Sequence, residues 1–211
     1  NGATLNLTID GTSELGAGYR DDGTITIKDR AIVNTNTGIL GYYTSTGTAI
    51  VTGPGSAWIN NDYLAVGYNG TGVLTITNGG LVTNESTRIG YLAAGMGYLT
   101  ADSIGKVLVN GEGSTLASRY LFVGNAGTAF LSIANGGLAS ATDNLVINSR
   151  SKVTIDVGHG SALRSGTEEN YHNYGIKNDG VIRLVAGAGV PPGSYTPLLC
   201  WGLTGRGSVQ A

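Results

Sequence analysis

The sequence has very little of several residue types, and each shortage excludes a class of protein. Cys200 is the only cysteine, so the chain cannot form an internal disulfide. We interpret it as a small buried apolar residue rather than a reactive thiol. Charged residues make up 12% of the chain and the net charge is −2, so nothing in the charge points to a nucleic-acid partner. No apolar run approaches the ~18 residues of a membrane-spanning helix, so we expect no span within this chain.

The residues that carry most enzyme chemistry are equally scarce. The two histidines, His159 and His172, belong to no metal-binding or catalytic motif. Acidic residues are adjacent only at Asp21-Asp22 and Glu168-Glu169, far apart in the chain. A calcium ion at Asp21-Asp22 is an alternative to a solvated turn, which we favour. The sequence therefore predicts no catalytic residue, no metal site and no bound cofactor.

Glycine, by contrast, is abundant at 36 residues, and it recurs within a repeat. The segment 63–67 (YLAVG) returns as 120–124 (YLFVG), 57 residues later. The segment 74–81 (LTITNGGL) returns as 131–138 (LSIANGGL) at the same offset of 57. Because separate motifs share one offset, the chain contains an internal duplication.

Each long unit divides into two shorter ones of about 25 residues, which alternate between two types. One type carries Asn-Gly-Gly and the other carries Gly-x-Gly-Ser. The starts of successive units, Gly23, Gly47 and Gly72, are spaced 24 and 25 residues apart. The segment 92–108 is longer than its counterparts, which predicts a loop or bulge there.

Within a unit, apolar and polar residues alternate with the period of a β-strand. Ile25 and Ile27 alternate with threonines, as do Leu74 and Ile76. Glycine, asparagine and aspartate interrupt the pattern every few residues, and they tolerate the positive φ that sharp corners need. The pattern predicts short strands joined by tight corners.

Two architectures fit such strands, an antiparallel sandwich and a parallel solenoid. The constant offset favours the solenoid, because equivalent residues of successive rungs then stack about 4.8 Å apart. Leu74 and Leu131 should share an interior column, and Asn78 and Asn135 a corner column. We therefore predict an all-β fold: a right-handed single-stranded parallel β-helix (β-solenoid) with a C-terminal cap. Solenoid repeats should occupy 1–165, and 166–211 should form a capping segment that continues the solenoid.

The repeat resembles a known family. The segments 64–68 (LAVGY), 70–80 (GTGVLTITNGG) and 109–116 (VNGEGSTL) are similar to the autotransporter and PEP-CTERM-associated repeat of bacterial secreted proteins. The resemblance covers about 23–165. It implies a parallel β-helix, export to the bacterial cell surface or beyond, and a role in adhesion or surface structure.

Four tyrosines recur at similar points of successive rungs. Tyr19, Tyr42, Tyr68 and Tyr91 are spaced 23, 26 and 23 residues apart, and each follows or neighbours a glycine. They could form an exposed ladder that contacts a glycan or a protein partner. The alternative, which we favour, is a stacked column that stabilises the solenoid. Asn125 and Asn148 occupy the next two places, so the ladder should stop there.

Three functions remain open from the sequence. The first is a non-catalytic extracellular surface protein, structural or adhesive, which could self-assemble through its ends or faces. The second is a carbohydrate-binding or polysaccharide-active β-helix protein. The third, ice binding through Thr-x-Thr columns, ranks last because Ala49 and Leu108 interrupt those columns. The expected partners are further copies of the chain or surface glycans.

Overall fold

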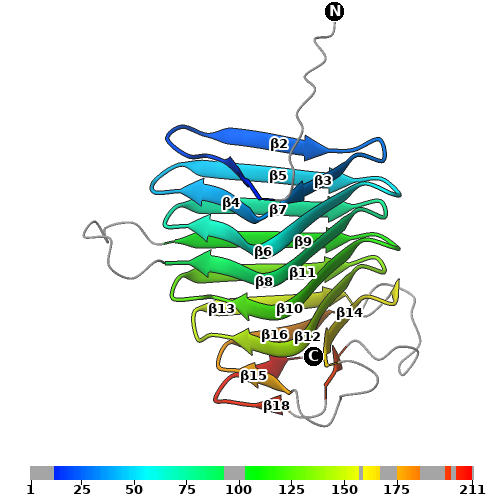
Figure 1. Cartoon of the computed structure of the whole chain (residues 1–211). Coiled ribbons are helices and arrows are strands. Elements are labelled where there is room, and N and C mark those ends of the chain that lie inside the picture. The colour runs from blue at the N-terminus through cyan, green and yellow to red at the C-terminus, as the bar shows by residue number, and fades with distance from the viewer. Residues whose placement is uncertain are drawn as a thin grey trace, which may run out of the picture.

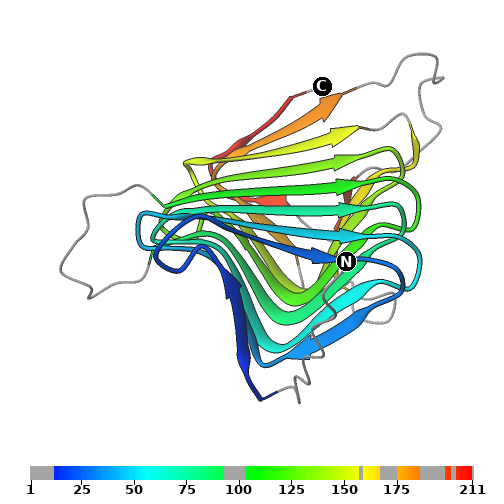
Figure 2. The same cartoon turned by 90° about the horizontal axis from the view of Figure 1, so that it is seen from above.

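The computed structural model shows a stack of parallel strands wound into a solenoid (Figure 1). Seen along the stack, the chain turns clockwise as it recedes from its N-terminal end, so the winding is right-handed (Figure 2). The predicted all-β, single-stranded parallel solenoid is confirmed. The structure describes residues 12–92, 103–156, 159–166, 175–185, 198–200 and 203–210.

One side of the solenoid, which we call the first face, is a parallel sheet of eight strands. In its strands, inward apolar residues alternate with outward residues that are mostly polar, which is the period that the sequence pattern predicted. Along the stack, the strands of the first face are β2 (Gly23–Ile27), β5 (Thr46–Thr52), β7 (Thr71–Thr77), β9 (Ile104–Asn110), β11 (Thr128–Ala134), β13 (Ser151–Asp156), β16 (Val181–Val185) and β19 (Ser208–Gln210).

The other two sides form one continuous sheet of eleven strands. Its longest strands bend, and the register shifts at the bend, between Asn60 and Tyr63 in one strand. The part before the bend is the second face and the part after it the third face, which gives the triangular outline of Figure 2. In chain order the strands are β1 (Glu14–Ala17), β3 (Ile32–Thr35), β4 (Thr37–Tyr42), β6 (Ala57–Tyr68), β8 (Leu81–Tyr91), β10 (Thr115–Val123), β12 (Leu138–Ile147), β14 (Ala162–Ser165), β15 (Ile176–Asn178), β17 (Leu198–Leu199) and β18 (Leu203–Thr204).

The strand register confirms the repeat that the sequence shows. Gly23 pairs with Gly47, which pairs with Gly72, so the starts of the units lie side by side. Leu74 and Leu131 both pair with Val107 and share one inward column, as predicted. Because all these pairs are parallel, the antiparallel sandwich is excluded.

The inward columns form a single apolar core along the axis. Trp58, Leu64, Leu74 and Ile76 are fully buried, and equivalent positions of later rungs continue the cluster. Cys200 is partly buried and packs against this core, consistent with the apolar role expected for it.

The register corrects one detail of the threonine columns. Ala49 pairs with Ile25 and Leu74 and is fully buried, so it lies in an inward column and interrupts no outward one. The outward column that begins at Thr26 is instead broken by Ile50, on the strand next to it. The error arose because one misplaced residue moves a side chain to the other side of a strand.

The corner between the first and second faces explains the Asn-Gly-Gly motif. Asn78 and Gly79 both have positive φ, at 53° and 79°. Gly80 has a different role, because a β-carbon there would lie closer than 3.0 Å to the backbone of Val51. The motif therefore supplies two residues in the left-handed backbone conformation, followed by a glycine at which the backbone of the neighbouring rung lies very close.

The corner between the second and third faces is held by a buried ladder of polar side chains. Thr35 donates a hydrogen bond to Asn60 Oδ1 at 2.7 Å, and Asn60 Nδ2 donates to Asn84 Oδ1 at 2.7 Å. Asn84 Nδ2 continues the ladder to Ser118 at 3.4 Å. Trp58 Nε1 donates to the Thr35 hydroxyl at 3.0 Å, so the largest core side chain is tied to the same ladder. Because buried amides need partners, this ladder fixes the register of the corner.

Strands from the predicted capping segment extend both sheets. β16 pairs with β13, and β19 pairs with β16, which carries the first face onward in parallel register. β15 pairs with β12, and β18 pairs with β15, which carries the other sheet onward. The predicted loop at 92–108 lies mostly outside the described residues, but Thr71 pairs with Ile104, so this rung is longer than its neighbours.

The polar ladder gives a prediction about stability. Replacing Asn84 by alanine leaves the buried amide of Asn60 without an acceptor, so we expect the free energy of unfolding to fall by about 1–3 kcal/mol. Urea unfolding measures this change. Asn144→Ala is the matched control, because Asn144 is exposed, and it should change stability by less than about 0.5 kcal/mol. Equal losses in both variants would contradict a structural role for the ladder.

Candidate contact surface

The corner between the third and first faces is built on glycine. Gly18, Gly41, Gly67 and Gly90 all have positive φ. A β-carbon on any of them would lie closer than 3.0 Å to backbone atoms of a first-face strand. Only glycine fits such a pinched corner, and the residue after it is directed outward.

In four successive rungs that next residue is tyrosine, as the sequence predicted. Tyr19 and Tyr42 stack with ring centroids 4.6 Å apart and planes at 4°. Tyr42 and Tyr68 stack at 5.1 Å and 22°, whereas Tyr68 and Tyr91 meet edge to face at 5.0 Å and 62°. Strand pairing also aligns Tyr42 with Tyr68 and Tyr68 with Tyr91. The structure therefore brings together all four residues of the proposed ladder.

Further aromatic residues, which the sequence reasoning did not include, extend this surface. Tyr43 packs edge to face on Tyr42 at 4.3 Å. The Arg88 guanidinium lies over the rings of Tyr63 and Tyr91, at 4.6 Å and 5.1 Å from their centroids. All seven tyrosines of the described residues lie on the third face or its glycine corner. We call this set the tyrosine face: Tyr19, Tyr42, Tyr43, Tyr63, Tyr68, Tyr91 and Tyr120.

The repeat itself contained the signal for two of the added residues. Tyr63 and Tyr120 open the two matching segments YLAVG and YLFVG. In the structure both pair with Ser86, so they share one outward column. Arg88 had no such signal, because the rungs on either side of it have Ala65 and Phe122 at that place.

Stacking limits what the ladder can contact. The ring faces of Tyr42 and Tyr68 pack against neighbouring tyrosine rings, so a sugar ring cannot lie flat on them. Tyr19 at 58% exposed and Tyr43 at 44% exposed are the rings most open to solvent. The arrangement is a rigid aromatic rib with two open rings and a rim of hydroxyl groups.

The environment of the rings favours their neutral form. The pKa of Tyr42 is raised to about 12, first by its side-chain hydrogen bond with Tyr43 and then by burial. Burial is the main cause of the raised pKa of Tyr63 and of Tyr68. Tyr42, Tyr63 and Tyr68 therefore carry uncharged hydroxyl groups at physiological pH.

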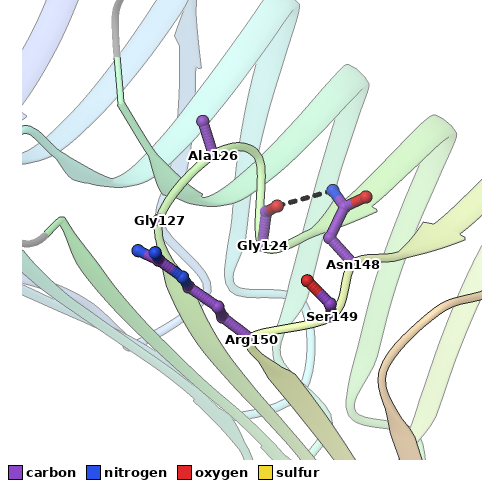
Figure 3. A pocket seen from close by; sticks show the side chains of 6 residues that line it. All are labelled: Gly124, Ala126, Gly127, Asn148, Ser149 and Arg150. Atoms are coloured by element: carbon purple, nitrogen blue, oxygen red, sulfur yellow. Dashed lines mark hydrogen bonds between the residues drawn. The ribbon is translucent and has the colours of Figure 1, made fainter. Parts of the chain in front are cut away.

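The ladder ends below Tyr91, and an open hollow follows it. Asn125 stands level with Tyr91, as expected, but Asn148 does not follow in the same column. Val123 pairs with Ile147, so Asn148 stands level with Gly124 and donates a hydrogen bond to its carbonyl at 2.5 Å. The hollow of about 270 Å³ beside this corner is shown in Figure 3 and is lined by Gly124, Ala126, Gly127, Asn148, Ser149 and Arg150.

Two other ionisable residues noted in the sequence, His159 and Asp22, lie at corners of the solenoid. His159 Nδ1 is 3.5 Å from Asp156 on an exposed corner. The Asp22 carboxylate accepts a hydrogen bond from the backbone of Thr46 at 2.7 Å, which suits the turn expected there. Within the part of the chain that the structure describes, no three histidine, cysteine or acidic side chains cluster as metal ligands. His172 and Glu168-Glu169 lie outside the described residues.

The fold and this surface define a parallel β-solenoid repeat protein with one aromatic face. The chain is 32% identical over 168 residues to a protein of Escherichia coli (strain K12) named uncharacterized lipoprotein YdeK. The match covers 75% of this chain and 12% of YdeK, so the chain corresponds to a small part of that protein. No family model matches the chain, and no solved structure matches it. Among the described residues, no helix has the length and apolarity to span a membrane.

The hydrogen bond between Tyr42 and Tyr43 gives a prediction about alkaline pH. Tyr43→Phe removes it, so Tyr42 should ionise earlier in a titration of tyrosinate absorbance. Because folding raises the pKa of Tyr42 from about 10 to about 12, its contribution to stability is complete below about pH 10 and is lost as pH rises through 12. The free energy of unfolding should fall less steeply over that range in the variant. Tyr120→Phe, the control, should leave the late ionisation unchanged; a Tyr43→Phe titration identical to the wild type would contradict the assignment.

Proposed function

We propose that this chain is a non-catalytic part of a bacterial surface protein, with a structural or adhesive role. The observation that carries the proposal is the tyrosine face: all seven described tyrosines lie on one side of a rigid rod. Tyrosine offers a large, stiff and partly polar contact area at low entropic cost, and it is enriched in protein contact surfaces. A rod of stacked rungs holds such a surface in place and away from its point of attachment.

The surface location rests on two likenesses. YdeK is named a lipoprotein, and lipoproteins are attached to membranes through their lipid. The repeat also resembles the autotransporter and PEP-CTERM-associated repeat of exported proteins. Both support export of this chain to the bacterial surface or beyond, as part of a longer protein.

The distribution of charge supports a role without catalysis. The most connected ionisable group is on an exposed corner, where Arg119 lies 2.9 Å from Glu85 and 2.6 Å from Asp143. These two acidic groups hold the pKa of the Arg119 guanidinium above its ordinary value, so it stays charged. These two ion pairs link three successive rungs, which is a structural role.

Self-association is one form that this contact could take. β2 and β19 are the outermost strands of the first face among the described residues. An edge strand offers unpaired backbone groups to another strand, so a further rung or a further copy could add there. The tyrosine face offers the alternative of side-by-side contact.

The exposed rings provide a test of the proposal. Tyr19→Ser with Tyr43→Ser removes the two open rings, so we expect adhesion of protein-coated beads to bacterial cells, or self-association in sedimentation velocity, to drop by about tenfold. Ile32→Ser is the matched control, because Ile32 is 62% exposed on the second face. Circular dichroism should show the same β-structure in all variants.

Two results would contradict the proposal. Equal adhesion and equal self-association of the wild type and the double variant would exclude the tyrosine face as the contact surface. Release of new sugar ends from a panel of polysaccharides, lost on replacing one carboxylate, would show an enzyme instead.

A further inference from the structure

The first face carries a second surface of different chemistry, in its later rungs. Phe130 on β11 pairs with Lys106 on β9 and with Lys152 on β13, so the three outward side chains form one column. Lys106 is exposed, Lys152 half-buried, and Phe130 is 40% exposed, although it is apolar. Arg150 lies two residues before Lys152. Arg183 on β16 pairs with Thr154, which lies two residues after Lys152 on β13. We call these five residues the basic strip.

The cations of the basic strip have no acidic partner among the described residues. The ion pairs of the described chain involve Lys28, Arg119, His159 and Lys177, and none of the strip. The nearest carboxylates by register have contacts outside the strip: Asp156 lies 3.5 Å from His159 Nδ1, and Asp179 forms an ion pair with Lys177 at 3.7 Å. The strip is therefore a local positive surface on a chain whose net charge is −2.

The hollow of Figure 3 adjoins the strip and adds polar groups to it. Arg150, which belongs to the strip, lines the hollow together with Ser149 and Asn148. Its guanidinium group extends along the corner toward Gly127 (Figure 3). A planar guanidinium beside hydroxyl and amide groups suits a carboxylate, because it can donate two parallel hydrogen bonds to it.

We infer that the basic strip binds an acidic polysaccharide, one that carries uronate carboxylates, along the solenoid axis. Lys106 and Lys152 are two strand spacings apart, roughly 10 Å. An extended polyuronate presents carboxylates at intervals of the same order. The exposed ring of Phe130 lies between the two lysines, where it can stack on the apolar side of a sugar ring. Unlike the stacked tyrosines of the ladder, Phe130 has no aromatic partner among the described residues.

A polysaccharide fits this surface better than a membrane or a nucleic acid. Lys106, Phe130 and Lys152 follow one column of the first face, so the two lysine charges lie on a line along which a linear polymer can bind. A membrane surface would need basic groups spread over a broad area, and the outward residues of the earlier first-face strands are threonine, valine and isoleucine. Stable nucleic-acid binding rests on many phosphate contacts, which four cations on an acidic chain do not supply.

Binding of polygalacturonate, measured by isothermal titration calorimetry, tests the inference. Lys106→Gln with Lys152→Gln should weaken binding by about tenfold or more. The control pair, Lys28→Gln with Arg30→Gln, makes the same change in net charge at an exposed corner away from the strip and should leave binding unchanged. Phe130→Ser, which keeps every charge, should also weaken binding. Added salt should weaken binding by the wild type.

Several results would overturn the inference that the basic strip binds an acidic polysaccharide. Equal losses of affinity in the strip variant and in the control pair would show that only net charge matters, and unchanged binding by Phe130→Ser would exclude stacking on the ring. Binding to vesicles of anionic phospholipid without binding to polygalacturonate would assign the strip to a membrane. The tyrosine face is intact in all these variants, so a failure of polygalacturonate binding would not count against the proposed adhesive role. In the same way, the tyrosine variants leave the basic strip intact, so their adhesion does not test it.

Discussion

The whole molecule depends on closing each rung at the glycine corner. There the third-face strand approaches the first face so closely that a β-carbon at Gly41 or Gly67 would collide with backbone. Once the corner closes, the next rung begins in register with the last, and all three faces stack in parallel. The inward residues then form one continuous core, because equivalent apolar residues of successive rungs stack on one another.

In-register stacking also explains how a chain with so few charged and aromatic residues can build surfaces. A residue type that recurs once per rung is sparse in sequence but adjacent in space. The tyrosines become a rib in this way, and Arg119 joins acidic residues from the rungs on both sides of it. Each surface belongs to a different column, so the faces can acquire separate tasks on one unchanging core.

The repeat offset predicted most of the fold and the tyrosine ladder, because both follow from equivalent positions in successive rungs. It did not predict the bend within β6 and its relatives, which adds residues between Asn60 and Tyr63 and moves side chains between faces. A register shift of the same kind between β10 and β12 leaves Asn148 one place short of the tyrosine column. Ala49 lies on the first face, away from the bend, and faces inward because it pairs with Ile25 and Leu74 of the inward column. The basic strip was missed because Phe130 separates Lys106 from Lys152, so no residue type recurs in successive rungs and only the register shows that the three are neighbours.

The buried asparagine ladder has a mechanical consequence. Backbone hydrogen bonds between rungs run along the solenoid axis, so a pull on the two ends loads them directly and peels rungs away one at a time. The side-chain bonds from Thr35 through Asn60 and Asn84 to Ser118 run in the same direction inside the rod. They act as extra tethers, shielded from water, that must break before those rungs can separate. The rod should therefore resist separation of its rungs best where this ladder lies, between β3 and β10.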